Sequence, residues 1–203
     1  TVDVDQIDLG RRSYYGLTAP LLESEHMGAD GILGLDSLQD QRVLVDFKKG
    51  LMAIDDAKNL GGNRGFDIVV EARRRSGQLI MADAKLEGIR VQVVIDTGAE
   101  TSIGNLALQK ALSRKRKNEK VELLSVTGHM INADLAYARW LEIKDVRFNN
   151  VAIAYTDAPA FKALKLDSRP AMLLGMRDLR MLDRLAIDFA TRRILFDVPA
   201  GVL

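Results

Sequence analysis

The chain has 203 residues, of which 47% are hydrophobic and 28% charged, a composition typical of a globular protein with one large or two small domains. Its formal net charge of +1 gives no global electrostatic reason to bind nucleic acid or a membrane surface, and no apolar run reaches the length of a membrane span. The absence of cysteine excludes disulfides, thiolate metal sites and cysteine nucleophiles. The two histidines, His26 and His129, have no ligand spacing around them, so we expect neither a metal site nor a serine–histidine hydrolase.

Short strands are predicted in the first 55 residues. Apolar residues gather in Ile7–Leu9, Leu17–Ala19, Val43–Phe47 and Leu51–Ile54, with polar or turn-forming residues between them. Residues 56–65 contain three glycines and two asparagines, and this composition predicts a linker.

The next strands lead to the most informative motif of the chain. Alternation over Phe66–Ala72 and an apolar run at Leu79–Ala82 predict two strands. The β-branched run Val91–Ile95 then predicts a buried strand that ends at Asp96-Thr97-Gly98, followed by Ala99-Glu100-Thr101-Ser102-Ile103. No residue of that run can ionise. Asp96 is therefore the single carboxylate at the end of the strand, where a tight turn begins.

The following segment predicts a helix and a hairpin. Leu108 and Leu112 have helical spacing within Leu106–Arg116, and we interpret the basic residues 114–117 as a solvated helix end because aromatic residues do not alternate with them. Two strand-like stretches between Val121 and Ala138 flank Gly128, which predicts a hairpin with this glycine at its tip. Tyr137 and Trp140 are expected in the core.

The last third contains a second apolar signature. Leu173-Leu174-Gly175 predicts a strand whose glycine allows another backbone to approach closely. Asp178–Leu185 shows helical spacing of leucines, and Leu185–Phe189 and Ile194–Phe196 predict two final strands.

Together these motifs resemble the retropepsin-like aspartic peptidases. That family places Asp-Thr-Gly-Ala-(Asp/Glu)-x-(Ser/Thr) after an apolar strand, and a hydrophobic-hydrophobic-Gly element with a short helix further along the chain. The resemblance implies a mainly β fold, an acid-protease β-barrel lobe with short helices. It also implies that Asp96 is catalytic, that Thr97 and Gly98 support the catalytic loop, and that Ala99, Glu100 and a flap tip at Gly128 bind substrate.

An internal repeat suggests a further half-lobe. Gly31–Leu38 parallels Met172–Leu179, and Val43–Phe47 parallels Leu185–Phe189. We therefore expect residues 1–55 to be the C-terminal half of a first lobe, 56–65 a linker, and 66–203 a complete lobe. The chain begins with Thr1 instead of Met, and we expect an upstream segment to complete the first lobe.

The implied activity is that of an aspartic endopeptidase, in which two carboxyl groups activate a water molecule. Asp96 supplies one of them, while Asp36, Asp46, Asp178 and Asp188 lie in the later motifs and are poor substitutes. The second carboxyl could come from a homodimer partner or from the missing N-terminal segment. The alternative is a catalytically inactive peptide-binding or assembly module that retains the fold.

The expected partners follow from this interpretation. They are a protein or peptide substrate and either a second copy or an N-terminal segment; no nucleic acid, metal or cofactor is expected. The resemblance to bacterial proteins favours a periplasmic or exported location, but no targeting motif decides it.

Overall fold

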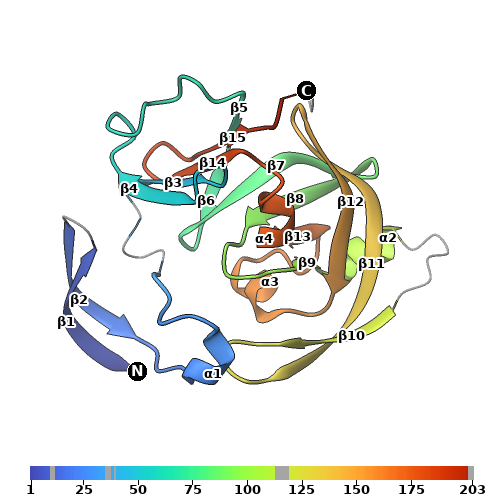
Figure 1. Ribbon diagram of the computed structural model, residues 1–203. Helices are drawn as coiled ribbons and strands as arrows, with labels where there is room; N and C mark the ends of the chain where they lie inside the picture. Colours follow the sequence, from blue (N-terminus) through green and yellow to red (C-terminus); the bar gives the residue numbers. More distant parts are fainter. Residues whose placement is uncertain (10–11, 35–37, 39, 113–118, 201–203) are drawn as a thin grey trace.

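The computed structural model describes residues 1–9, 12–34, 38, 40–112 and 119–200. It is mainly β, with four short helices among the described residues, which confirms the fold class expected from the sequence (Figure 1). None of the described helices is long and apolar enough to cross a membrane. The basic residues 114–117 and Asp36 lie outside the described ranges.

A closed β-barrel forms one side of the molecule, on the right in Figure 1. Each strand pairs with the next in spatial order, and the first and last also pair, through Leu86 with Leu141 and Ala84 with Ile143. Closure removes the exposed strand edges that an open sheet would leave. The six strands, in spatial order, are β7 (Gln78–Leu86), β8 (Ile89–Ile95), β13 (Ala171–Leu174), β9 (Ser102–Gly104), β12 (Val146–Tyr155) and β11 (Met130–Ile143).

Two outer strands and two helices complete this part of the fold. Strand β6 (Arg73–Arg75) pairs with β7, and β10 (Glu119–Leu124) pairs with β11. Helix α2 (Leu106–Leu112) contacts β8 and β13, with Leu108 fully buried. Helix α3 (Pro159–Ala163) buries Phe161 in a small apolar cluster on the barrel. The helix predicted over Leu106–Arg116 is therefore confirmed as far as the structure describes it.

A five-stranded sheet joins the N-terminal segment to the barrel chain. Its order is β4 (Leu51–Asp55), β3 (Arg42–Asp46), β14 (Arg184–Asp188), β15 (Arg193–Asp197) and β5 (Ile68–Glu71). Strands β3 and β4 form one hairpin, β14 and β15 form another, and the two hairpins meet along antiparallel β3 and β14.

The pairing of β3 with β14 places repeated residues opposite one another. Leu44 pairs with Ala186, its counterpart in the sequence repeat. The flanking hydrogen bonds repeat in the same way, because the Phe47 amide donates to the Asp183 carbonyl (2.9 Å) and the Phe189 amide to the Gln41 carbonyl (3.0 Å). A pseudo-twofold axis therefore passes through Leu44 and Ala186 and relates the two hairpins.

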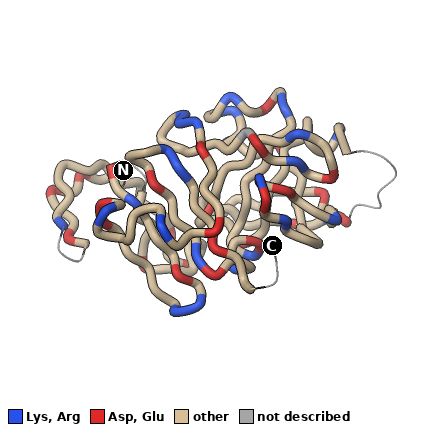
Figure 2. Tube along the Cα trace, turned by 90° about the horizontal axis from the view of Figure 1, so that it is seen from above, with Lys and Arg blue, Asp and Glu red and all other residues tan. Residues whose placement is uncertain are grey.

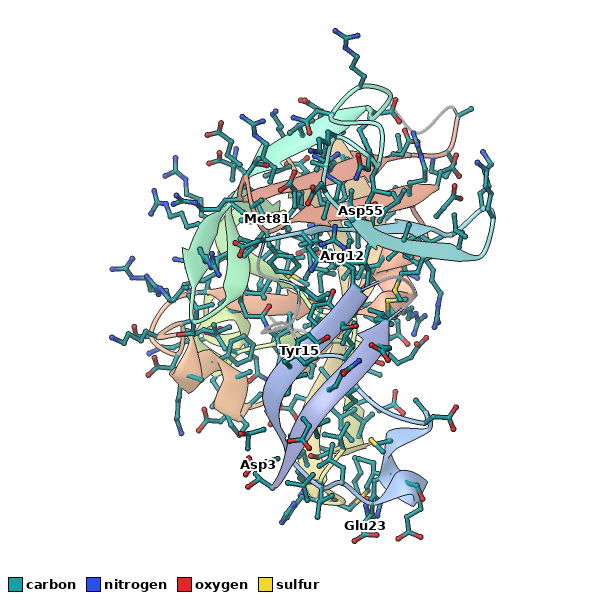
Figure 3. All side chains as sticks on the ribbon, turned by 90° about the vertical axis from the view of Figure 1, so that its left-hand side faces the viewer. Asp3, Arg12, Tyr15, Glu23, Asp55 and Met81 are labelled. Atoms are coloured by element: carbon teal, nitrogen blue, oxygen red, sulfur yellow. The ribbon has the colours of Figure 1, made fainter. Side chains whose placement is uncertain are left out.

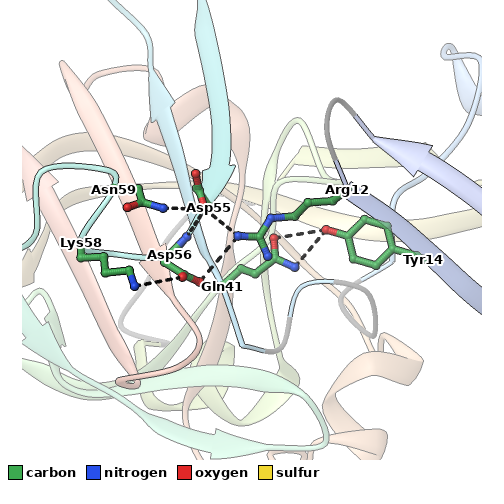
Figure 4. A network of polar contacts seen from close by, with 7 residues as sticks. All are labelled: Arg12, Tyr14, Gln41, Asp55, Asp56, Lys58 and Asn59. Carbon is green, nitrogen blue, oxygen red and sulfur yellow. Dashed lines mark hydrogen bonds and ion pairs between the residues drawn. The ribbon is translucent and has the colours of Figure 1, made fainter.

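The first residues form a separate two-stranded sheet beside this arrangement. Strands β1 (Val2–Leu9) and β2 (Arg12–Ala19) pair antiparallel, and helix α1 (Ser24–Met27) follows (Figures 1 and 3). Side-chain contacts tie β2 to the five-stranded sheet: Arg12 lies 2.6 Å from Asp55, and Tyr14 is hydrogen-bonded to Gln41 (Figure 4). The predicted division at residues 55 and 65 remains a prediction.

Two local expectations were wrong. Helix α4 spans only Met176–Leu179, and Leu185 lies in strand β14, so the leucine spacing over Asp178–Leu185 did not mark a continuous helix. Tyr137 is exposed, because on β11 its neighbours Ala136 and Ala138 take the inward positions, and Trp140 is half-buried. Acidic and basic residues are interspersed along the chain trace, in agreement with the small net charge (Figure 2).

Candidate active site

Asp96 is the first residue after strand β8. That strand pairs in parallel with β13, up to Ile95 opposite Leu174, and the Asp96 amide then donates a hydrogen bond to the Leu174 carbonyl at 3.0 Å. Val93 and Val94, which precede it, are buried. The strand therefore fixes the point at which the carboxylate leaves the barrel, as the sequence predicted.

In the turn after Asp96, backbone amide groups lie next to the Asp96 carboxylate. The Gly98 amide donates to Asp96 Oδ1 at 3.0 Å, and a Cβ on Gly98 would lie 3.3 Å from the same oxygen. Asp96 is half-buried, and burial raises its pKa above the ordinary value although the amides of Gly98 and Ala99 oppose this shift. Among the described residues, no second carboxyl contributes to that shift.

The loop after Asp96, residues 97–101, packs directly against Gly175. The Met176 amide donates to the Ala99 carbonyl (2.8 Å), and the Arg177 amide donates to the Glu100 carbonyl (2.9 Å). A Cβ on Gly175 would lie 2.8 Å from that Glu100 oxygen, closer than real contacts allow. The predicted reason for this glycine, close approach of another backbone, is confirmed.

A buried hydrogen-bond network lies beneath the loop. Ser102 Oγ accepts from the Gly175 amide at 3.0 Å and donates to Asp178 Oδ2 at 2.5 Å. Ser102 is 0% exposed and Asp178 2%, and burial raises the pKa of Asp178 although the Ser102 hydrogen bond lowers it. Asp178 thus supports the loop that carries Asp96. The sequence reasoning did not predict this role, since no local pattern indicates that Ser102 and Asp178 meet.

The sequence of this region matches a known family. Residues 82–177, just under half of the chain, match the family model described as aspartyl protease. The resemblance stated from the motifs is therefore confirmed, and family and fold together support a protease-like function.

Comparison with solved structures and curated proteins adds two findings. A crystal structure of a retropepsin-like aspartic protease from Rickettsia conorii aligns with 19% sequence identity and a TM-score of 0.48, over 64% of this chain and 89% of that chain. No curated protein matches.

Within the matched segment, the remaining residues of the loop after Asp96 are exposed or half-buried. Thr97 and Glu100 are exposed and Ala99 is half-buried. Glu100 forms an ion pair with Arg180, whose Nη1 lies 2.8 and 3.0 Å from the two carboxylate oxygens. Arg180 directly follows α4, so this ion pair links the loop to that helix. The predicted roles of Thr97, Gly98, Ala99 and Glu100 remain predictions.

Gly128 lies in the turn of the β10–β11 hairpin. The Ser125 amide donates to the His129 carbonyl and the Gly128 amide to the Ser125 carbonyl, both at 2.9 Å. Gly128 has a φ of 79°, the left-handed region that glycine adopts readily. The imidazole of His26, from α1, packs against it so closely that a Cβ on Gly128 would lie 2.5 Å from His26 Cε1. The hairpin with Gly128 in its turn is confirmed, and the role of flap tip remains a prediction.

The described residues contain no cluster of three or more histidine, cysteine, aspartate or glutamate side chains able to hold a metal ion.

Proposed function

We propose that this protein is an aspartic endopeptidase in which Asp96 is one member of a catalytic pair of carboxyl groups. The observation that carries the proposal is the placement of Asp96: a half-buried carboxyl at the end of a barrel strand, inside a turn held by Gly98 and Gly175, within the segment that matches the aspartyl protease family.

The chemistry follows from two carboxyl groups held close together around one water. Two carboxyl groups so close together do not both ionise, because their negative charges would repel each other. The pair therefore shares one proton over a wide pH range. The ionised member takes a proton from the water as this attacks the peptide carbonyl, and the protonated member donates to the carbonyl oxygen. The raised pKa of Asp96 suits a group that must hold or release this proton.

The five-stranded sheet supports a complementary half-lobe over a homodimer partner as the source of the second carboxyl group. A homodimer that joined two copies of β14 across a twofold axis would need the edge of β14 that β3 already occupies. The pseudo-twofold axis through Leu44 and Ala186 instead favours a complementary half-lobe, built onto residues 1–55, as the donor. Such a half-lobe would be either an upstream part of the natural polypeptide or a separate chain.

The substrate class that fits this site is an extended peptide. The β10–β11 hairpin with Gly128 at its turn would cover the bound chain and exclude water, and the exposed Glu100 would contact the peptide main chain. The alternative is a binding module without catalysis, which would bind such a peptide and leave it intact.

A cleavage assay tests the proposal. The purified chain is incubated with an unfolded protein substrate over a range of chain concentrations, alone and with the upstream half-lobe added. We expect cleavage when the half-lobe is present, and a bell-shaped pH profile, since one carboxyl must be ionised and the other protonated.

The decisive variant is Asp96→Asn, with Asp145→Asn, in an exposed turn, as the matched control. We expect Asp96→Asn to abolish cleavage and to leave the melting temperature nearly unchanged, whereas Asp145→Asn keeps both. Cleavage by Asp96→Asn at the wild-type rate would refute the assignment. Peptide binding without cleavage under every condition would establish the inactive module instead.

A further inference from the structure

The segment that follows β2 reaches across to the β10–β11 hairpin. This strap, residues 20–34, carries helix α1 near its middle, and Figure 1 shows α1 beside the turn end of the hairpin. No residue of α1 is buried, and Gly28, with a φ of 62°, ends the helix. Further along the strap, Leu33 packs against the main apolar core. The helix therefore has no core of its own, and its position depends on what it contacts at the hairpin.

That contact is made by the ring of His26. A Cβ on Gly128 would lie 2.5 Å from His26 Cε1, 2.9 Å from Nδ1 and 3.1 Å from Nε2, so the ring lies directly against the glycine. His26 Nδ1 is buried and has no hydrogen-bond partner among the described residues, and Nε2 lies 3.5 Å from Glu25 of the same helix. An unpaired buried nitrogen costs free energy, so the ring holds the turn by its shape and not by hydrogen bonding.

The turn that His26 contacts is a compact unit. Ser125 Oγ lies 2.8 Å from Thr127 Oγ1, which lies 3.0 Å from His129 Nδ1, in addition to the two backbone hydrogen bonds of the turn. Because these bonds join residues on both sides of Gly128, a contact that holds the glycine holds the whole turn.

The end of the hairpin extends beyond the barrel. Strand β11 pairs with β12 only from Asp134 onward, whereas its pairing with β10 begins at Met130. Residues 130–133 thus have β10 as their only ladder partner among the described strands. Apolar side chains near the turn are exposed, namely Leu124 (55%), Val126 (39%) and Met130 (56%). The hairpin end, residues 124–133, is therefore a two-stranded arm with an exposed apolar surface, and two strands alone are only marginally stable.

We propose that α1 is a latch on this arm. With the His26 ring on Gly128 the latch is closed, and the arm is held against the strap. When the ring leaves, the arm moves as a unit and an extended peptide can enter beneath it, so the latch sets the fraction of molecules that are open to substrate. The part that concerns peptide entry rests on the proposed function, whereas the latch itself is a property of the fold.

A spin label measures whether the latch is closed. The chain has no cysteine, so Glu23→Cys provides a single attachment site for a nitroxide; Glu23 is exposed and its side chain makes no capping hydrogen bond. NMR on the full chain measures how strongly the nitroxide relaxes the amide signals of residues 127–130. His26→Ala should reduce this relaxation enhancement by roughly threefold, because the open state gains population when the contact is lost.

Two matched variants separate the shape of the ring from other effects. His26→Phe keeps a planar ring and removes the unpaired nitrogen, so it should retain the wild-type enhancement. Glu25→Ala, on the same helix and with a side chain that is 79% exposed, should retain it as well.

The effect on peptide entry is measured in the cleavage assay with the complementary half-lobe present. His26→Ala should raise kcat/KM by roughly threefold, because a site that is closed for part of the time binds more weakly in proportion to its open fraction. His26→Phe should leave kcat/KM unchanged. Absence of cleavage by every variant would refute the proposed function and with it the control of peptide entry, while the spin-label result would still decide whether the latch exists.

Three results would overturn the proposal. Equal enhancement in wild type and His26→Ala would show that the ring does not hold the arm. A loss in His26→Phe as large as that in His26→Ala would show that the contact depends on the imidazole nitrogens and not on the shape of the ring. Loss of enhancement in His26→Ala with an unchanged kcat/KM would show that the contact does not limit peptide entry.

Discussion

Replacing Arg42 by methionine should destabilise the protein strongly, because it leaves the carboxylate of Asp188 buried without its cation. Arg42 is 1% exposed and Asp188 0%, and Arg42 Nη2 lies 2.7 Å from Asp188 Oδ2. The same guanidinium also donates to Asn63 Oδ1 (2.6 Å) and to the Gly62 carbonyl. This ion pair joins β3 of the N-terminal segment to β14.

The expected magnitude comes from the desolvation of an unpaired charge. Removing one partner of a buried ion pair costs about 3–5 kcal/mol of unfolding free energy. In a chain of this size each kcal/mol shifts the melting temperature by about 2–4 °C, so the loss is on the order of 10 °C. The double variant Arg42→Met/Asp188→Leu removes both charges and should recover most of the loss.

The chain offers a matched control at the counterpart of Arg42. Arg184 pairs with Asp197 at 2.6 Å, but its side chain is 32% exposed, and its guanidinium also lies 4.7 Å from the Phe66 ring centroid. Arg184→Met should therefore cost only about 1–2 kcal/mol. Urea denaturation of the four proteins measures these differences.

The effect of Arg42→Met should also depend on pH. Burial alone would raise the pKa of Asp188, but hydrogen bonds from Thr191 and the ion pair with Arg42 outweigh it and hold the pKa below the ordinary value. This contribution to stability is present above the unfolded pKa of about 3.9 and is lost as the pH falls through the folded value. The gap between wild type and Arg42→Met should thus be larger at pH 7 than at pH 3. Equal losses for Arg42→Met and Arg184→Met, or a double variant as unstable as the single one, would refute this reasoning.

Two further substitutions examine the protease lobe. Ser102→Ala removes the hydrogen-bond donor to Asp178 and should lower the free energy of unfolding by about 1–3 kcal/mol. Burial raises the pKa of Asp178 in the folded state, and loss of the Ser102 hydrogen bond, which lowers it, makes the ionised carboxylate still less favourable. The loss measured by urea denaturation should therefore be larger at pH 7 than at pH 4, and a pH-independent loss would contradict this. Gly128→Ala should cost at least about 1–2 kcal/mol, from its positive φ and from the contact with His26. Adding His26→Ala should recover the second part only, so a double-mutant cycle with no coupling would show that the contact contributes nothing.

The sequence was most informative where local pattern and chemistry agree. Three features were predicted: the apolar run before Asp96, the glycine of Leu174-Gly175 and the hairpin around Gly128. Each combines strand periodicity with a residue whose presence only one backbone arrangement explains. The helix over Asp178–Leu185 was predicted wrongly because leucines at helical spacing also occur where a short helix runs into a buried strand.

Contacts between distant segments were beyond single-sequence reasoning. Nothing near Ser102 indicates that its hydroxyl meets Asp178, and nothing near His26 indicates that its ring packs on Gly128. The repeat of Val43–Phe47 in Leu185–Phe189 was visible, yet the repeat alone does not say that the two copies pair with each other.

That pairing also explains the aspartates that the repeat retains. Asp46 accepts a hydrogen bond from the Lys49 amide at 2.9 Å, and Asp188 accepts one from the Thr191 amide at 2.8 Å, so each carboxylate closes the turn that follows its strand. Their shared position in the repeat thus reflects turn formation, and neither is available as a second catalytic acid. Asp36 lies outside the described residues; of the described aspartates considered from the sequence, Asp96 alone stands in a turn at a barrel strand end with its carboxylate held by backbone amides. We therefore propose that the second carboxyl group comes from across the pseudo-twofold axis.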